Sequence, residues 1–427
     1  MTQESGSASP RSEPALARLR RAARWLAHQE LWLTLPLVAL LAFPNPLSPW
    51  AVLGVLGLWL CRWAGRGTIT RRTPVDIPIL VLLLTVPVGL WASADLDHSW
   101  PVVYQVVAQV ALFYALVNTA RSARWLTVLA GAVVLVALTV AVFNLVEVLV
   151  LGERLLSEKA LAGRGPLGFP KRNVTGGILA FLLPIPLALS LRAVRRTRSA
   201  WLVQALLGLV TVVVGASLLI AQTRGAWIGL VIAILVIAIC HNRWFALLIP
   251  VVIVGVVVVT YYVGPEQVSE AVLALDLTSS GQSRWELWQR GVYMIQDFPF
   301  TGVGLGMFAL VGNLLYPLFT ISEYPEHVHN IYLQAGIDHG LPGLVAFAAL
   351  FMLLIYMVIQ AIRRSSVSMQ RALAVGLLGS LVVYLVHGLV ESITTYARAG
   401  IIVWGVMGVM AALWLYTREA GERESSG

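Results

Sequence analysis

A histidine pair stands in a long polar stretch of this otherwise apolar chain. Residues 327–343 read HVHNIYLQAGIDHGLPG, so His327 and His329 flank one valine and Asn330 follows directly. An imidazole titrates near neutral pH and can take a proton from a hydroxyl group, which makes either histidine a candidate general base. The alternative is a structural histidine that caps a loop. No cysteine or third ligand is spaced for zinc along the chain, so the sequence predicts no metal site.

Two arginines have surroundings that suit phosphate binding. Arg224 lies in AQTRGAWIGL, at a turn between two apolar stretches. Arg284 is the third residue of QSRWELWQRG. A guanidinium presents a rigid fork of donors to phosphate oxygens. Two of them can neutralise the charge that develops on a departing pyrophosphate. The alternatives are a snorkelling interfacial arginine at position 224 and a solvated one at position 284.

Three further patterns carry weaker signals. His387 and Glu391 are four residues apart near the expected end of an apolar helix, so they would share one face, as a functional pair or as a helix–helix hydrogen bond. Asp95-Leu96-Asp97 has a metal-binding form, but it lies in a short loop. The glycines of GVGLGMF (302, 304 and 306) lack a strand–helix context and predict a tight backbone path rather than a nucleotide site.

The composition indicates a membrane protein. The chain has 427 residues, of which 58% are hydrophobic and 12% charged, and its mean hydropathy is +0.81. A soluble domain carries about 25% charged residues. The net charge of +9 is explained by arginines that gather in the loops of one side, so no nucleic-acid partner is expected. The two cysteines lie near expected helix ends, where a disulfide is not expected.

Hydropathy predicts an all-α, polytopic membrane protein with about twelve transmembrane helices, each of roughly 20 apolar residues. The expected spans are 30–46, 48–64, 75–93, 101–119, 125–149, 173–191, 201–221, 225–241, 244–263, 341–361, 370–390 and 398–416. We expect residues 1–25 to be a disordered cytoplasmic tail, 26–420 to be one transmembrane domain, and 421–427 to be a second cytoplasmic tail.

The positive-inside rule orients these spans. With both termini cytoplasmic, 21 of the 30 Lys and Arg residues lie on inside segments, and every inside connection carries at least one. The long loop 264–340 is then periplasmic. It contains a predicted interfacial helix, in which Trp285, Trp288, Val292 and Ile295 recur at three- and four-residue spacing. The topology does not explain the basic residues left outside, namely Arg154, Lys159, Arg164, Lys171, Arg172, Arg224, Arg284, Arg290 and Arg398.

The segment HNIYLQAGIDHGLPG resembles a loop motif of the O-antigen ligase and polymerase superfamily. His329-Asn330 is followed after nine residues by Gly340 and after two more by Gly343. FPKRN at 169–173, TRGAW at 223–227 and SRWELW…DFPFTGVGLGMF at 283–308 resemble other family segments in the same order. The resemblance covers roughly residues 165–400. Thr223 departs from it, because the family often has serine before the arginine.

The resemblance implies an enzyme of the bacterial inner membrane, a glycosyltransferase whose active site faces the periplasm. The implied donor is a glycan on polyprenyl (undecaprenyl) pyrophosphate. The acceptor hydroxyl belongs to the lipid A core in a ligase, which we favour, or to a second lipid-linked glycan in a polymerase. The transfer is implied to be inverting, independent of metal and without a cofactor; membrane lipids are the other expected partners. A transporter or flippase is a less favoured class, because polar residues gather at the outer face instead of along a central path.

By resemblance, Arg224 and Arg284 would hold the pyrophosphate and His329 would serve the acceptor hydroxyl, which makes these three the expected catalytic residues. The expected substrate-binding residues surround them. They are Arg164, Lys171, Arg172, Asn173, Arg290, His327, Asn330, His387 and Glu391.

Overall fold

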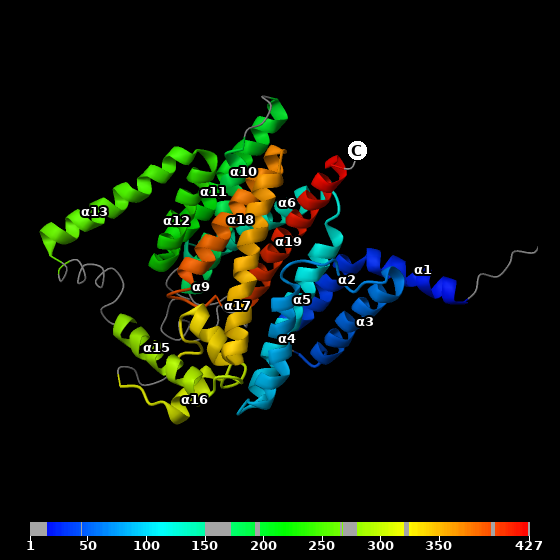
Figure 1. The fold of residues 1–427 in the computed structure, drawn as a ribbon, viewed down its shortest axis with the longest axis horizontal. Helices are drawn as coiled ribbons and strands as arrows, with labels where there is room; N and C mark the ends of the chain where they lie inside the picture. The colour runs from blue at the N-terminus through cyan, green and yellow to red at the C-terminus, as the bar shows by residue number, and fades with distance from the viewer. Residues whose placement is uncertain are drawn as a thin grey trace, which may run out of the picture.

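The structure, a computed structural model, describes residues 15–43, 45–149, 172–192, 197–264, 267, 280–319, 324–393 and 398–425. Helices and turns account for the regular structure of these ranges, and no strand occurs in them, so the all-α prediction is confirmed there (Figure 1). Most of the helices form one bundle, which buries a continuous apolar core between α4, α5, α17, α18 and α19.

The bounds of the helices follow. They are α1 (Ala15–His28), α2 (Glu30–Ala42), α3 (Ser48–Arg66), α4 (Asp76–Trp91), α5 (Leu96–Thr119), α6 (Ala123–Leu149), α9 (Arg172–Leu182), α10 (Pro184–Ser190), α11 (Arg198–Ala221), α12 (Arg224–His241), η1 (Arg243–Leu247), α13 (Leu248–Val263), α15 (Ser280–Asp297), α16 (Phe308–Leu315), α17 (Ile331–Arg364), α18 (Ser368–His387) and α19 (Arg398–Ser425).

Eight helices of the described ranges are long and apolar enough to cross a membrane, or nine if the bent pair Ala17–His28 and Glu30–Ala42 forms one span. The multi-pass prediction is therefore confirmed, whereas the count of twelve stays a prediction. Two of the expected spans, α4 and α13, have 16 residues each, just below the usual lower limit of about 17. The expected disordered tail is helical over residues 15–25, which belong to α1.

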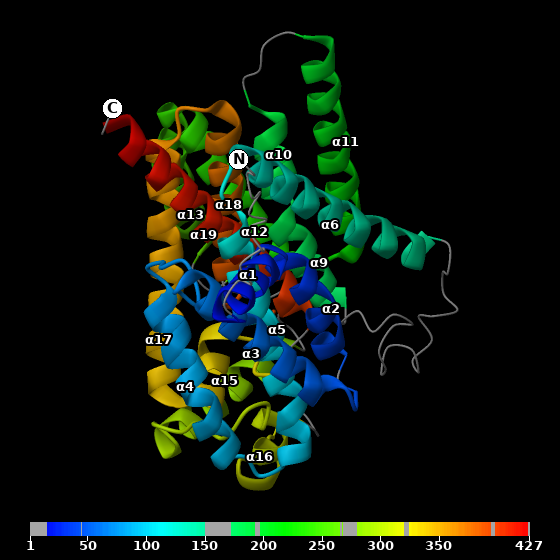
Figure 2. The same ribbon diagram turned by 90° about the vertical axis from the view of Figure 1, so that its right-hand side faces the viewer.

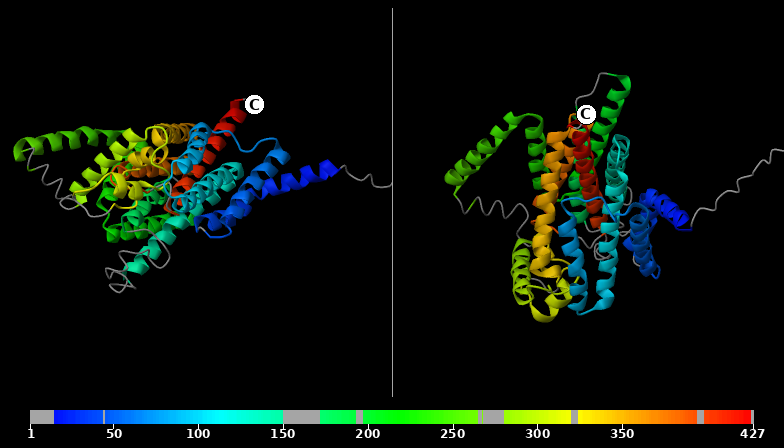
Figure 3. Two further views of the ribbon diagram at one scale, coloured as in Figure 1. Left: turned by 90° about the horizontal axis from the view of Figure 1, so that it is seen from below. Right: turned by 45° about the vertical axis from the view of Figure 1, so that its right-hand side comes forward.

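A short-helix layer covers one end of the bundle. In two side views, α15 and α16 lie against the lower end of α17, and the C-terminus lies at the opposite end (Figures 2 and 3). This layer has its own apolar core, which includes Leu287 and Met294 of α15 and Phe308 of α16. The apolar stripe that the sequence predicted on α15 is not the face that packs against this core. Trp285 is 61% exposed and Val292 is 38% exposed, whereas Leu287 and Met294 are buried.

Helix α17 begins ten residues earlier than the predicted span. The prediction began at 341, but the side chain of Asn330 accepts hydrogen bonds from the backbone N–H groups of Tyr332 and Leu333 and so caps a helix that starts at Ile331. The helical path breaks at Gly340, whose φ and ψ are 66° and −172°. The polar loop 264–340 therefore ends at residue 330.

The glycine loop 302–306 fills the space beside that break. Gly302, Gly304 and Gly306 all have positive φ, which confirms the predicted tight backbone path. The N–H of Val303 donates to the carbonyl oxygen of Ile337 at 2.8 Å, immediately before the break. The N–H of Leu341 donates to the carbonyl oxygen of Pro299 at 2.7 Å, immediately after it. The loop thus satisfies backbone groups that the interrupted helix leaves open.

We expect Gly340→Ala to destabilise the fold. The backbone conformation of Gly340 is one that only glycine adopts readily, and an added Cβ would lie 2.7 Å from the carbonyl carbon of Phe300. Strain of this kind costs about 1–3 kcal/mol. Tryptophan fluorescence during heating in detergent should show an earlier unfolding midpoint. The control is Gly131→Ala on α6, where nothing lies within 4 Å of an added Cβ, and its midpoint should not fall. Equal midpoints for the two variants would contradict the assignment.

Candidate functional site

One buried carboxylate joins the two histidines of the polar segment. Oε1 of Glu391 lies 2.8 Å from Nδ1 of His329 and 3.1 Å from Nε2 of His327. The carboxylate side chain is 3% exposed, while the imidazoles are 23% and 18% exposed. The same oxygen accepts the backbone N–H of Ser392 at 3.0 Å. Three donors therefore converge on one buried oxygen.

The protonation of this cluster follows from its geometry. Burial alone would raise the pKa of Glu391, but the hydrogen bonds from His327 and His329 hold that pKa well below its usual range. An ionised carboxylate only accepts hydrogen bonds, so each histidine donates from the nitrogen that faces it. His329 then carries its proton on Nδ1 and leaves a lone pair on Nε2. A base oriented in this way can take a proton from a hydroxyl group.

The backbone at His329 adopts an unfavourable conformation. Its φ is 53°, in the left-handed region that residues other than glycine rarely occupy. Strain at such a position persists only where the surroundings hold it, and it concentrates at functional sites. Here the next residue, Asn330, fixes the backbone, because it caps α17 and its Nδ2 donates to the carbonyl oxygen of Leu389 at 3.0 Å. The N–H of Ile331 adds a bond to the carbonyl oxygen of Gly388 at 2.8 Å.

The hydrogen bonds of Asn330 indicate what role its side chain can have. Its side-chain oxygen and nitrogen are both used by the chain, and the residue is 9% exposed. A substrate would compete with the cap for the same atoms. The geometry therefore gives Asn330 a positioning role, which attaches the histidine segment to the end of α18.

The sequence spacing predicted that His387 and Glu391 share one helix face. The structure shows that they do not. Helix α18 ends at His387, and Glu391 lies in the following segment, from which its side chain turns toward His327 and His329. His387 is 2% exposed and packs between two glycines, Gly177 of α9 and Gly225 of α12. Within the described ranges neither of its ring nitrogens has a hydrogen-bond partner.

The N-termini of α9 and α12 meet beside His387. A Cβ on Gly176 would overlap the side chain of Thr223, so the first turns of the two helices touch. Arg224 is the first residue of α12 and is exposed, and Asn173, the second residue of α9, is exposed as well. Helix N-termini present free N–H groups and partial positive charge to anions.

Arg284 of α15 approaches the same region. Its charge acts on the ring of His387, which itself touches Gly225 next to Arg224. Arg284 and the backbone next to Arg224 therefore lie in the neighbourhood of one buried histidine, and a joint role of the two arginines stays a prediction. Arg164 and Lys171 lie outside the described residues. Arg172 opens α9, but its side chain lies outside the described part as well.

Arg290 is occupied by its own helix and the following loop. Its guanidinium lies 3.7 Å from a carboxylate oxygen of Glu286 and stacks over the rings of Tyr293 and Phe319 at 5.8 and 5.5 Å. Glu286 also accepts the N–H of Phe319 at 2.7 Å. These contacts attach Arg290 to the short-helix layer, and its predicted substrate-binding role stays a prediction.

Sequence reasoning missed a polar relay behind the histidines. Gln334 accepts the N–H of Val328 at 3.0 Å and donates to Asp338 at 2.7 Å, and Asp338 accepts the N–H of Gly306 at 3.3 Å. The relay connects the histidine segment to the glycine loop. Its signal in the sequence was two polar residues four apart among apolar ones, which a helix starting at 331 would have placed on one face.

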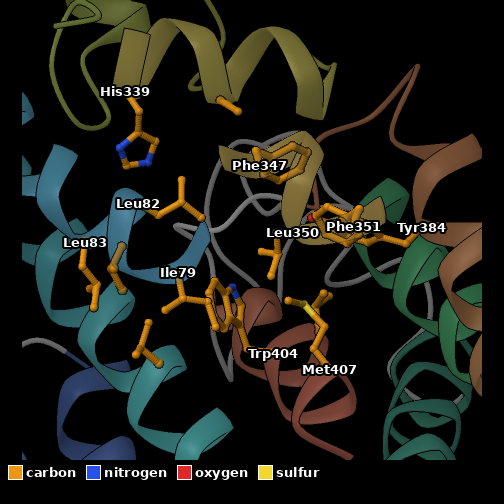
Figure 4. A pocket seen from close by; sticks show the side chains of 14 residues that line it. Ile79, Leu82, Leu83, His339, Phe347, Leu350, Phe351, Tyr384, Trp404 and Met407 are labelled. Carbon is orange, nitrogen blue, oxygen red and sulfur yellow. The ribbon is translucent and has the colours of Figure 1, made fainter. Parts of the chain in front are cut away.

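His339 is buried next to the break of α17. Its Nδ1 lies 2.8 Å from the hydroxyl of Thr85 on α4. Figure 4 shows it at the edge of a pocket whose lining, including Leu82, Phe347 and Trp404, is mostly apolar. Such a lining offers few of the hydrogen-bond partners that a polar ligand requires, so the candidate site is the histidine cluster rather than this pocket.

The histidine cluster also changes the argument about metals. The side-chain donor atoms of His327, His329 and Glu391 all lie within 4.8 Å of one another. The sequence predicted no metal site because no third ligand is spaced nearby along the chain. In the fold a third potential ligand comes from 62 residues further along the chain, so spacing alone does not decide the question.

Comparison with known proteins identifies the region around this site. A family model described as O-Antigen ligase matches residues 209–348, which include α12, α15, the glycine loop and both histidines. No curated protein matches the chain. The family match confirms the resemblance seen in the motifs within residues 209–348, and this stretch is similar to the O-antigen ligase family.

We expect Asn330→Ala to lower the free energy of unfolding by at least about 1 kcal/mol, because it removes a helix cap and the hydrogen bond to the carbonyl oxygen of Leu389. The control is Asn242→Ala, which removes an exposed cap that accepts only the N–H of Trp244. Thermal unfolding in detergent should show the larger loss for position 330. A larger loss at position 242 would argue against the anchoring role.

Proposed function

We propose that this chain, a membrane protein with an O-antigen ligase family domain at residues 209–348, transfers a glycan from polyprenyl pyrophosphate to an acceptor hydroxyl. The proposed setting is the periplasmic face of a bacterial inner membrane, with both termini in the cytoplasm. The observation that carries the proposal is the Glu391–His329 pair, which directs the free ring nitrogen of His329 away from the carboxylate. Further support comes from His387, at the same end of α18: the charge of Arg284 acts on its ring, and Gly225, next to Arg224, contacts it.

In this proposal His329 removes the proton of the acceptor. Nε2 takes the hydroxyl proton while the acceptor oxygen bonds to the glycosyl carbon and the bond from that carbon to the pyrophosphate oxygen breaks, with inversion. The positive charge that develops on the imidazole is stabilised by the carboxylate of Glu391, as in other base–carboxylate pairs. His327, on the same carboxylate oxygen, supports its position.

The leaving group is the second requirement. Polyprenyl pyrophosphate departs with the electron pair of the broken bond, so negative charge grows on its oxygens. Arg224 and Arg284 supply permanent positive charge, and the adjacent N-termini of α9 and α12 add oriented N–H groups. These groups can balance the charge without a cation, which supports a metal-independent transfer.

The lipid A core is our first choice of acceptor. The support is the single long outer loop that carries the His-Asn motif, a feature we associate with the ligases of this superfamily. A polymerase would use a second lipid-linked glycan in the same position. Supplying each acceptor separately to the purified protein distinguishes the two.

The first test compares three histidine variants in proteoliposomes supplied with a glycan on undecaprenyl pyrophosphate and either acceptor. His329→Ala should lower the transfer rate about 10²–10⁴-fold, the usual contribution of a general base. His327→Ala should lower it less, because the base remains. His98→Ala, an exposed histidine at the start of α5, serves as the control and should keep the wild-type rate. A His329→Ala rate within about threefold of wild type, under 1 kcal/mol of barrier, would exclude the base.

The second test is a double-mutant cycle on Arg224 and Arg284. If both hold one pyrophosphate, each alanine variant leaves the same clamp half-built, and their losses in transfer rate should not add. Lysine should replace either poorly, because a point charge cannot make a two-pronged contact. Arg243→Ala, just beyond the opposite end of α12, is the control and should not affect transfer. Strictly additive losses would place the two arginines in separate sites.

A further inference from the structure

We propose that His327, His329 and Glu391 also bind a divalent transition-metal ion such as Zn²⁺, and that the bound ion stops the transfer reaction. The binding site follows from the side-chain geometry alone. Only the inhibitory effect rests on the proposed function, since it requires His329 to act as the base.

The distances between the three donor atoms are already close to those between the ligands of a zinc ion. Zinc binds imidazole nitrogen and carboxylate oxygen at about 2.0–2.2 Å, which in a tetrahedron places two ligand atoms about 3.4 Å apart. The two nitrogen–oxygen distances are 2.8 and 3.1 Å, and all three donor atoms fall within 4.8 Å. Displacements of an ångström or less, absorbed by side-chain rotation, convert the hydrogen-bonded cluster into a ligand set.

The donor types select the ion. Two imidazoles and one carboxylate suit zinc and its neighbours, whereas Mg²⁺ and Ca²⁺ prefer oxygen ligands throughout. Three protein ligands leave a fourth position for water. The carboxylate is nearly buried and is held by the N–H of Ser392, while both imidazoles are partly exposed, so an ion can enter from the outer surface.

Coordination changes the tautomer of His329. The ion binds the lone pair that Nδ1 has in the other neutral tautomer. The proton that Nδ1 donated to Glu391 leaves for the solvent, and Nε2 takes up one proton from the solvent in its place, so no net proton is released. An imidazole with its proton on Nε2 can donate there but no longer accept. His329 then cannot act as the base, and the fold does not change.

The binding test uses titration calorimetry on the full-length protein in detergent after treatment with EDTA. Zn²⁺ should bind at this site, and Mg²⁺ should give no signal there. His327→Ala and Glu391→Gln should each weaken zinc binding at least tenfold, because each removes one of three ligands. His98→Ala is the matched control and should bind as wild type does. Equal affinity in all four proteins would place the ion elsewhere and overturn the proposal. A wild-type protein without zinc binding would overturn it as well.

The activity test adds Zn²⁺ to the transfer assay, followed by excess EDTA. Zinc should inhibit at the concentrations at which it binds, EDTA should restore the rate, and EDTA alone should leave the untreated enzyme unchanged. The rate of His327→Ala relative to its own zinc-free rate should resist zinc. If EDTA alone abolished transfer and zinc restored it, the ion would be required and its inhibitory role would be excluded. If no transfer occurred at all, the proposed function would fail, and calorimetry would still decide the metal site.

Discussion

The outer end of the molecule depends on a buried carboxylate. A charge as enclosed as that of Glu391 is unstable unless hydrogen-bond donors surround it, because removal from water costs several kcal/mol. Two imidazoles and one backbone N–H provide those donors. They reach the carboxylate only if residues 327–329 fold onto the end of α18. The left-handed backbone of His329 and the cap by Asn330 are the local consequences of that requirement.

A second constraint is the close approach of α9, α12 and α18. Glycines at 176, 177 and 225 remove the side chains that would separate these helices, as small residues do between helices in membranes. The space admits Thr223 and the ring of His387. As a result, the N-terminal parts of α9 and α12 lie side by side, and Arg224 is the first residue of α12. The anion binding that we propose for this region would therefore depend on packing as much as on the arginines.

Hydropathy predicted the helical class and many of the spans because membrane helices must satisfy their backbone hydrogen bonds internally and so appear as long apolar runs. The same reasoning placed α17 ten residues too late, since its first turns carry Gln334 and Asp338, which look like loop residues until their common face is known. The histidines and arginines were recognisable from residue type and motif. The partner of the histidines was not, because a contact across 62 residues depends on the fold. The stripe on α15 was misplaced for a similar reason: its buried face is chosen by the layer that packs against it.

The site separates two chemical demands that a single metal ion often meets together. The leaving group needs permanent positive charge, which arginine provides at any physiological pH. The acceptor needs a neutral base, which a neighbouring cation would suppress. In this structure the charge of Arg284 acts on the ring of His387, while the carboxylate beside His329 is negative. An ion at the histidines would place positive charge at the base, where it prevents proton transfer, rather than at the pyrophosphate, where it would help. Under the proposed function, the same three side chains would therefore form a candidate metal site and also take part in a transfer reaction that needs no metal.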